Sequence, residues 1–263
     1  MINRYLKLVP YLFQLILLTS IFGGIGYILA KYIFKITNEN VVHLLFIGFE
    51  FLGVAIFAHM NRRVTLICLN YLKINKKLLV LFLQNFLLIS LAFSFISIVS
   101  YYLGIIRIRE VIEINYLNMV LYFTLALAVA ICEEILFRGY IALYVNLIIN
   151  KKTALFLSSL LFSISHVQYN SILPFLTAML AGLIFALITF KYRSLLPAIA
   201  FHMGWNFSYF LFNDAFLVEI KMKFWGELFE IPQIILLFFV LGYLIYPSRP
   251  KHIELAAKKW TNG

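Results

Sequence analysis

Long runs without a charged residue are the feature that most constrains how this chain can fold. Uncharged runs cover residues 8–30, 78–106, 114–132, 153–190, 194–213 and 231–248, and residues 41–60 form an apolar run with one acid, Glu50. A helix of about 18 apolar residues can cross a bilayer. Only 13% of the residues are charged, against about 25% in soluble domains. The sequence therefore predicts an all-α polytopic membrane protein, with residues 1–263 as a single integral membrane domain.

The run at residues 153–190 is too long for one crossing at about 20 residues per helix. Residues 168–174 (QYNSILP) predict a break within it, which makes about eight transmembrane helices. Basic residues concentrate in cytoplasmic loops of membrane proteins, and an N-terminus in the cytoplasm gives that pattern here. Both termini are therefore expected to be cytoplasmic. The net charge of +11 reflects this topology and does not predict a nucleic-acid partner. The basic residues on the expected cytoplasmic side are Arg4, Lys7, Arg62, Arg63, Lys73, Lys76, Lys77, Lys151, Lys152, Lys191, Arg193, Arg249, Lys251, Lys258 and Lys259.

Residues 132–138 place two carboxylates and a guanidinium, those of Glu133, Glu134 and Arg138, inside an apolar stretch. A charged side chain at the centre of a bilayer costs about 3 kcal/mol even on the most lenient scale, so these groups need partners. Glu134 and Arg138 are four positions apart and can form a buried ion pair on one helix face. Glu133 points about 100° away and is left free to act as a general base.

The polar residues of three predicted helices reach similar depths in the membrane. Residues 117–150 are expected to form one long or bent helix, which places Glu133 roughly 27 Å from the cytoplasmic basic boundary. The same count of helical rise gives roughly 21 Å for His166, 14 Å for His202 and 20 Å for Asn206. These groups can therefore meet within the inner half of the membrane. His202 and Asn206 are four positions apart, so an imidazole and an amide share one helix face and could hold a water or stabilise an oxyanion.

The residues that other known mechanisms of peptide-bond hydrolysis require are missing from this chain. The single aspartate, Asp214, lies in a predicted outside loop, which excludes a pair of aspartates within the membrane. No His-Glu-x-x-His helix and no Gly-x-Ser-x-Gly elbow is present. Hydrolysis by glutamate and histidine is the chemistry that remains.

Three spaced motifs resemble those of the CPBP (Abi) family. They are Glu133-Glu134-x-x-x-Arg138, Phe162-x-x-x-His166 and His202-x-x-x-Asn206, all within residues 117–212, the expected catalytic core. The eukaryotic members of this family are the type II CAAX prenyl endoproteases, and its bacterial members include bacteriocin self-immunity proteins.

The resemblance implies a role for each motif residue. Glu133 and His166 would activate the attacking water, and His202 with Asn206 would stabilise the oxyanion. Glu134, Arg138 and Phe162 would support them. It also implies an intramembrane endopeptidase, related to the CAAX type, that acts on a membrane-associated or lipidated peptide. We expect the site to open to the cytoplasmic side of a bacterial cell membrane.

Several alternatives stay open at this stage. The chain could be a bacteriocin immunity protein or a membrane partner-binding protein that needs no hydrolysis. A transporter with a proton-carrying glutamate is disfavoured because the sequence has no internal repeat. Glu134 with Arg138 could be purely structural, and the two histidines could serve only to join helices. We expect no tightly bound metal, although Glu133, His166 and His202 could bind zinc. The sequence does not decide whether Glu50 belongs to the site, and Gly182 is interpreted only as a close-packing position.

Overall fold

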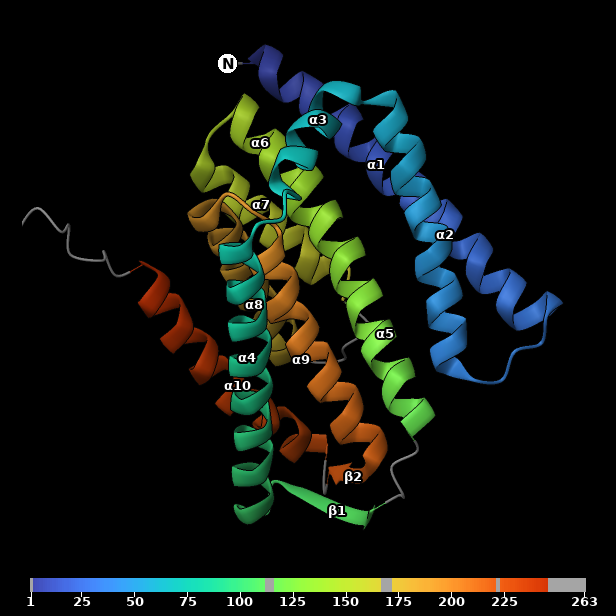
Figure 1. Cartoon of the computed structure of the whole chain (residues 1–263), viewed down its shortest axis with the longest axis vertical. Helices are drawn as coiled ribbons and strands as arrows, with labels where there is room; N and C mark the ends of the chain where they lie inside the picture. The colour runs from blue at the N-terminus through green and yellow to red at the C-terminus, as the bar shows by residue number, and fades with distance from the viewer. Residues whose placement is uncertain (1, 112–115, 167–171, 221–222, 246–263) are drawn as a thin grey trace, which may run out of the picture.

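The computed structural model describes residues 2–111, 116–166, 172–220 and 223–245. Helices make up most of this part of the chain, and two short strands are paired with each other. Figure 1 shows their arrangement. In chain order the elements are α1 (Ile2–Ile28), the π-helix η1 (Leu29–Ile33), α2 (Glu39–Met60), α3 (Arg62–Tyr71), α4 (Lys76–Tyr102), β1 (Ile106–Val111), α5 (Tyr116–Glu133), the π-helix η2 (Glu134–Ala142), α6 (Leu143–Ile148), α7 (Lys151–Ile164), α8 (Ile172–Tyr192), α9 (Leu196–Ala215), β2 (Phe216–Ile220) and α10 (Lys223–Ile245).

The described helices confirm an integral, polytopic helical membrane protein. Five of them are long and apolar enough to cross a membrane: Lys7–Ile33, Glu39–Met60, Lys76–Tyr102, Tyr116–Ile148 and Ile172–Tyr192. The predicted number was about eight. The difference arises partly because α7 has only 14 residues.

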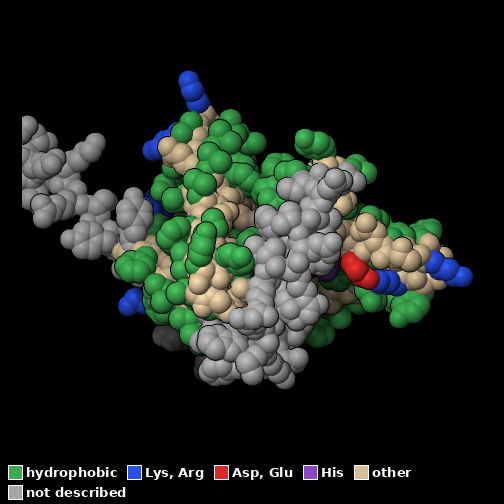
Figure 2. Space-filling model, turned by 90° about the horizontal axis from the view of Figure 1, so that it is seen from below, with side chains coloured by type: hydrophobic (Ala, Val, Ile, Leu, Met, Phe, Trp, Pro, Cys, Tyr) green, Lys and Arg blue, Asp and Glu red, His purple; other side chains and the backbone are tan. Residues whose placement is uncertain are grey.

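Apolar side chains cover the outside of these helices. On α4, Leu88, Leu91 and Phe95 are 63%, 69% and 67% exposed. Figure 2 shows hydrophobic side chains over most of the described surface at the end of the molecule opposite α3. Large exposed apolar areas of this kind fit contact with lipid rather than with water.

Asparagine side chains begin three of the helices. Asn38 accepts hydrogen bonds from the backbone N–H groups of Asn40 and Val41 at the start of α2. Asn75 accepts one from Leu78 at the start of α4, and Asn150 accepts one from Thr153 at the start of α7. These caps satisfy backbone donors that have no partner within the helix. They explain why the helices begin at the polar boundaries of the apolar runs.

The α1–α2 hairpin lies along one side of the molecule, and α5 runs between this hairpin and α9 (Figure 1). Two glycines allow the helices of the hairpin to approach each other closely. A Cβ atom at Gly53 would lie 2.7 Å from the Leu18 carbonyl oxygen, and one at Gly26 would lie 2.8 Å from that of Leu45. Any larger residue would push the two helices apart.

The helix expected at residues 117–150 is a continuous helical run in the structure, Tyr116–Ile148. Its central part, η2, is a π-helix of 9 residues that carries Glu134 and Arg138, and this feature was not predicted. The next predicted boundary, the break at residues 168–174, lies partly outside the described residues. Its proline, Pro174, is in the first turn of α8, where a missing N–H breaks no helical hydrogen bond.

The two strands depart from a purely helical chain. β1 and β2 pair antiparallel, with Ile106 opposite Ile220 and an irregularity between Ile108 and Val111. The pairing joins the end of α4 to the end of α9, which also pack against each other along their length. It therefore closes the lower end of the bundle in Figure 1.

Candidate active site

A buried ion pair forms the base of the site. Arg138 Nη1 donates to Glu134 Oε1 at 3.0 Å, and neither side chain is exposed. Arg138 Nη2 donates to the Gly182 carbonyl oxygen of α8 at 3.0 Å. The pair therefore joins η2 to α8 through charge-assisted hydrogen bonds, which offset the cost of removing both charges from water.

Aromatic rings and a glycine enclose the Arg138 guanidinium. Its Cζ atom lies 4.4 Å from the centre of the Phe162 ring and 5.0 Å from that of Phe185. A Cβ atom at Gly182 would lie 3.3 Å from Arg138 Nη2 and 3.1 Å from Ser159 Cα. Gly182 is therefore required both for the approach of α7 to α8 and for the space that Arg138 occupies.

His202 of α9 connects the ion pair to the second carboxylate. Its Nδ1 atom lies 2.9 Å from Glu134 Oε1, the oxygen that also accepts from Arg138. Its Nε2 atom lies 3.7 Å from Glu133 Oε2. The ring stacks on Phe185 with centroids 4.8 Å apart and an interplanar angle of 17°. The contact with Glu134 and the stacking on Phe185 hold the imidazole in one orientation between the two carboxylates.

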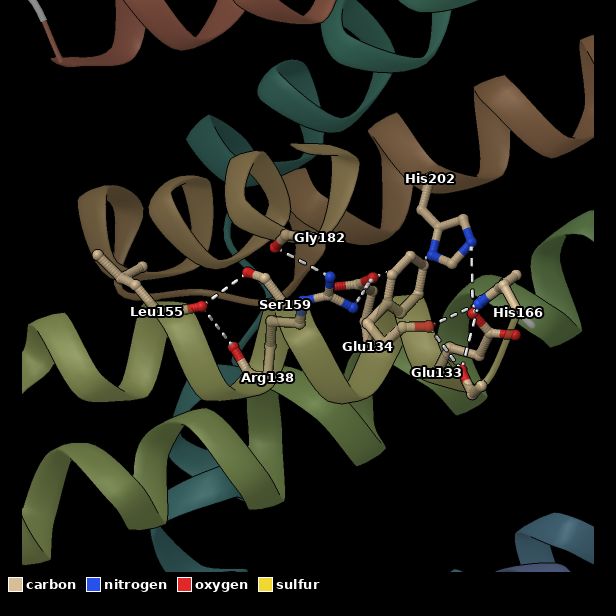
Figure 3. A network of polar contacts seen from close by, with 11 residues as sticks. Glu133, Glu134, Arg138, Leu155, Ser159, His166, Gly182 and His202 are labelled. Atoms are coloured by element: carbon tan, nitrogen blue, oxygen red, sulfur yellow. Dashed lines mark hydrogen bonds and ion pairs between the residues drawn. The ribbon is translucent and has the colours of Figure 1, made fainter. Parts of the chain in front are cut away.

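His166 approaches the same Glu133 oxygen from the end of α7. Its Nε2 atom lies 3.9 Å from Glu133 Oε2. Its Nδ1 atom lies 2.7 Å from the Phe162 carbonyl oxygen, which can only accept, so Nδ1 carries the proton. Nε2 of the neutral ring is then a hydrogen-bond acceptor that faces the carboxylate. Figure 3 shows both histidines directed at Glu133.

Glu133 Oε2 is the point at which the three side chains meet. It is buried, and it has no hydrogen-bond partner within the described part of the chain. Its distances of 3.7 and 3.9 Å to the two Nε2 atoms are too long for direct hydrogen bonds and suit a bridging water. The Glu133 and His166 side chains are 17% and 23% exposed. The site is therefore accessible on the side of these two residues, while Glu134 and Arg138 are fully enclosed.

The separations between Glu133 and the two imidazoles are longer than those of an ideal tetrahedral zinc site. Ligand atoms of a tetrahedral zinc site lie about 3.4 Å apart, since each bond is about 2.1 Å long. The two measured separations are longer than this. Among the residues that the structure describes, no group of three or more His, Cys, Asp or Glu is arranged to hold a metal ion.

The residues of this site lie within a recognisable family segment. Residues 115–208 match the model of the family described as Type II CAAX prenyl endopeptidase Rce1-like. Because of this similarity, we call residues 115–208 the Rce1-like segment. The match confirms the resemblance that the three motifs predicted, and it contains all of them. No curated protein matches the chain.

The structure places the predicted site residues of the Rce1-like segment in two groups. Glu133, His166 and His202 converge on one point, whereas Glu134 and Arg138 lie behind them. Phe162 contacts Arg138 and both histidine rings, with centroids 4.6 Å from His166 and 5.7 Å from His202.

Asn206 lies one turn after His202 on α9 and is half buried. Its amide has no hydrogen-bond partner among the described residues, so the structure does not join it to the other site residues by a direct contact. The amide groups of asparagine offer donors to an oxyanion, and Asn206 remains a candidate for this role.

Glu50 lies beside the Rce1-like segment, on α2. Its Oε2 atom accepts a hydrogen bond from Cys132 Sγ at 3.7 Å, one residue before Glu133. Sequence reasoning missed two supporting residues inside the segment. Gly182 was interpreted only as a packing position, and Phe185 had no signal at all, because one phenylalanine among 27 is not distinguishable by type.

Proposed function

We propose that this protein is an intramembrane endopeptidase that hydrolyses a peptide bond of a membrane-associated or lipidated, CAAX-like substrate. The single observation that carries the proposal is the convergence of Glu133 Oε2 with the Nε2 atoms of His166 and His202 at 3.7–3.9 Å. The Rce1-like match over residues 115–208 supports an endopeptidase at the family level.

In this mechanism Glu133 and His166 activate a water. Because the Phe162 carbonyl fixes the His166 proton on Nδ1, Nε2 can accept a hydrogen bond from the water and orient it. Glu133 takes the other proton as the water oxygen attacks the substrate carbonyl carbon. The same carboxyl group then returns that proton to the leaving amine, which balances the reaction.

His202 and Asn206 are proposed to stabilise the tetrahedral oxyanion. His202 can donate from Nε2 only when both of its ring nitrogens carry protons. The Glu134 carboxylate at Nδ1 would stabilise that positive charge, and Arg138 holds Glu134 in place. Donors aimed at a developing negative charge in a site shielded from water are an effective source of catalysis.

We also propose a topology of about eight crossings, with both termini in the cytoplasm and the site open to the cytoplasmic side. The distribution of basic residues supports it, because residues 62–77 hold five Lys or Arg and no acid. No tightly bound metal is part of the proposal.

The test uses full-length protein in proteoliposomes with a panel of farnesylated and unlipidated peptides in ¹⁸O-labelled water. We expect cleavage of at least one peptide, with one ¹⁸O atom in the new carboxylate. The absence of cleavage across the panel under conditions in which an active Rce1-like enzyme cleaves it would contradict the proposal. Activity that a chelator abolishes and zinc restores would contradict the metal-free mechanism.

A further inference from the structure

The end of the molecule that holds α3 carries a set of exposed basic side chains. These side chains belong to segments of the sequence that contain no acidic residue. Residues 51–109 and 135–213 contain no Asp or Glu at all. We call the exposed basic residues of these two segments at this end the α3 basic surface. It consists of Arg62, Arg63, Lys73, Lys76, Lys77, Lys151, Lys152, Lys191 and Arg193.

Two contacts hold the separate parts of the α3 basic surface together. The Tyr71 carbonyl oxygen at the end of α3 accepts a hydrogen bond from Leu195 N at 2.8 Å, which joins α3 to the turn that contains Arg193. Lys151 Nζ lies 5.4 Å from the centre of the Phe190 ring, which joins the start of α7 to the end of α8. Figure 1 shows α3 and the α6–α7 connection at the same end of the molecule. The basic segments therefore lie next to one another at one end of the fold.

Helix α3 also has the two faces of a helix that lies at a membrane interface. Val64 and Cys68 are buried, and a Cβ atom at Gly139 of η2 would collide with Cys68 Sγ. On the other side, Leu66 and Leu69 are 63% and 52% exposed. An amphipathic helix with basic flanks rests its apolar residues at the boundary between headgroups and acyl chains.

We propose that the α3 basic surface binds the phosphate groups of anionic phospholipids. The basic residues come from segments of the sequence that contain no acid, so they repel one another, and anionic headgroups offer the complementary charge. The exposed leucines of α3 favour a lipid over a soluble acidic partner, because one lipid molecule supplies acyl chains for the leucines together with a phosphate for the basic residues. The positive-inside rule alone requires basic loops, but it does not require them to form one surface around an amphipathic helix. The inference does not depend on the proposed peptidase activity.

The experiment measures lipid association directly. The full-length protein is reconstituted in phosphatidylcholine bilayers with a trace of spin-labelled phosphatidylglycerol or spin-labelled phosphatidylcholine, and the immobilised lipid fraction is read by electron paramagnetic resonance. Wild-type protein should prefer phosphatidylglycerol. Replacing Arg62, Arg63, Lys73, Lys76 and Lys77 by Gln should lower that preference by roughly fivefold or more, since a single basic residue near an anionic surface already contributes about that factor.

Two further variants keep the test decisive. If the variant with five substitutions does not fold, Lys73, Lys76 and Lys77 alone are replaced by Gln. This leaves α3 intact and should also lower the preference for phosphatidylglycerol. The control replaces Lys31 and Lys35, which follow α1 at the opposite end, and should leave the preference unchanged.

Four results would overturn the proposal. The first is equal association of wild-type protein with both spin labels. The second is a phosphatidylglycerol preference that survives in the folded variants. The third is loss of the preference in inorganic phosphate but not in chloride of equal ionic strength, which would indicate a site for free phosphate. Displacement of phosphatidylglycerol by an acidic peptide at equal ionic strength would instead identify a protein partner.

Discussion

At the scale of single residues, the two adjacent glutamates have different surroundings. Glu134 is fully buried and is bound by Arg138 and His202 through one oxygen. Glu133 is partly exposed, and its Oε2 atom faces two imidazoles at distances that leave room for a water. The sequence spacing predicted the ion pair, because positions four apart share a helix face. It could not predict the contact between His202 and Glu134, which lie 68 positions apart.

Replacing Arg138 by Met should destabilise the protein, because it leaves the Glu134 charge buried without its partner. Loss of one member of a buried pair costs about 3–5 kcal/mol. We expect a clear fall in the thermal unfolding temperature of the protein in detergent. The double substitution Glu134→Gln with Arg138→Met should recover part of that loss. A single variant as stable as wild type would show that the pair is not a structural requirement.

Replacing Asn206 by Ala should lower kcat by about 10²–10³-fold with little change in KM, if its amide donates to the oxyanion. The matched control is Asn85→Ala on α4, since within the described residues the Asn85 amide donates only to the Leu81 carbonyl of its own helix. Steady-state kinetics on a cleaved peptide give both constants. An equal effect of the two substitutions would remove Asn206 from the mechanism.

At the scale of elements, the site depends on how η2, α7, α8 and α9 pack. The positions of these helices were largely predictable, because uncharged runs mark them and polar caps begin them. The π-helix was not predictable. Its hydrogen bonds, from each residue to the fifth one along, are set by packing, and no pattern of residue types marks them in the sequence. The pairing of β1 with β2 was also not predictable, because the two strands lie far apart in the chain.

Replacing Gly182 by Ala should separate α7 from α8 and displace the Arg138 guanidinium. The added Cβ would lie 3.1 Å from Ser159 Cα and 3.3 Å from Arg138 Nη2, and overpacking of this kind costs about 1–3 kcal/mol. Thermal unfolding should show this loss together with reduced activity. At Gly48 a Cβ would meet nothing within 4 Å, so Gly48→Ala should be neutral. Equal stability of the two variants would contradict the packing role of Gly182.

At the scale of the whole molecule, the charge distribution and the apolar exterior determine how the protein sits in a bilayer. The helical membrane class was predictable from hydropathy alone. The number of crossings was less so, because α7 is a short helix whose 14 residues fall below the length expected for a full span of the bilayer.

Single cysteines placed at Lys77 and at Lys35 test the proposed orientation. Lys77 belongs to the segment proposed to be cytoplasmic and Lys35 to the segment proposed to be outside, and both are exposed. A membrane-impermeant maleimide added to intact cells should label the cysteine at position 35 and reach the one at position 77 only after the cells are opened. The reverse pattern would invert the topology and place the site on the outer side.

The most direct test of the central claim is the rate of peptide cleavage by the Glu133→Gln protein in proteoliposomes. The substitution keeps the size of the side chain and removes the group that takes the proton from water. We predict a fall of about 10²–10⁴-fold in kcat/KM, with unchanged folding, whereas Glu39→Gln, which alters an exposed acid, should cleave at the wild-type rate. Cleavage by Glu133→Gln at the wild-type rate would contradict the assignment of Glu133 as the general base.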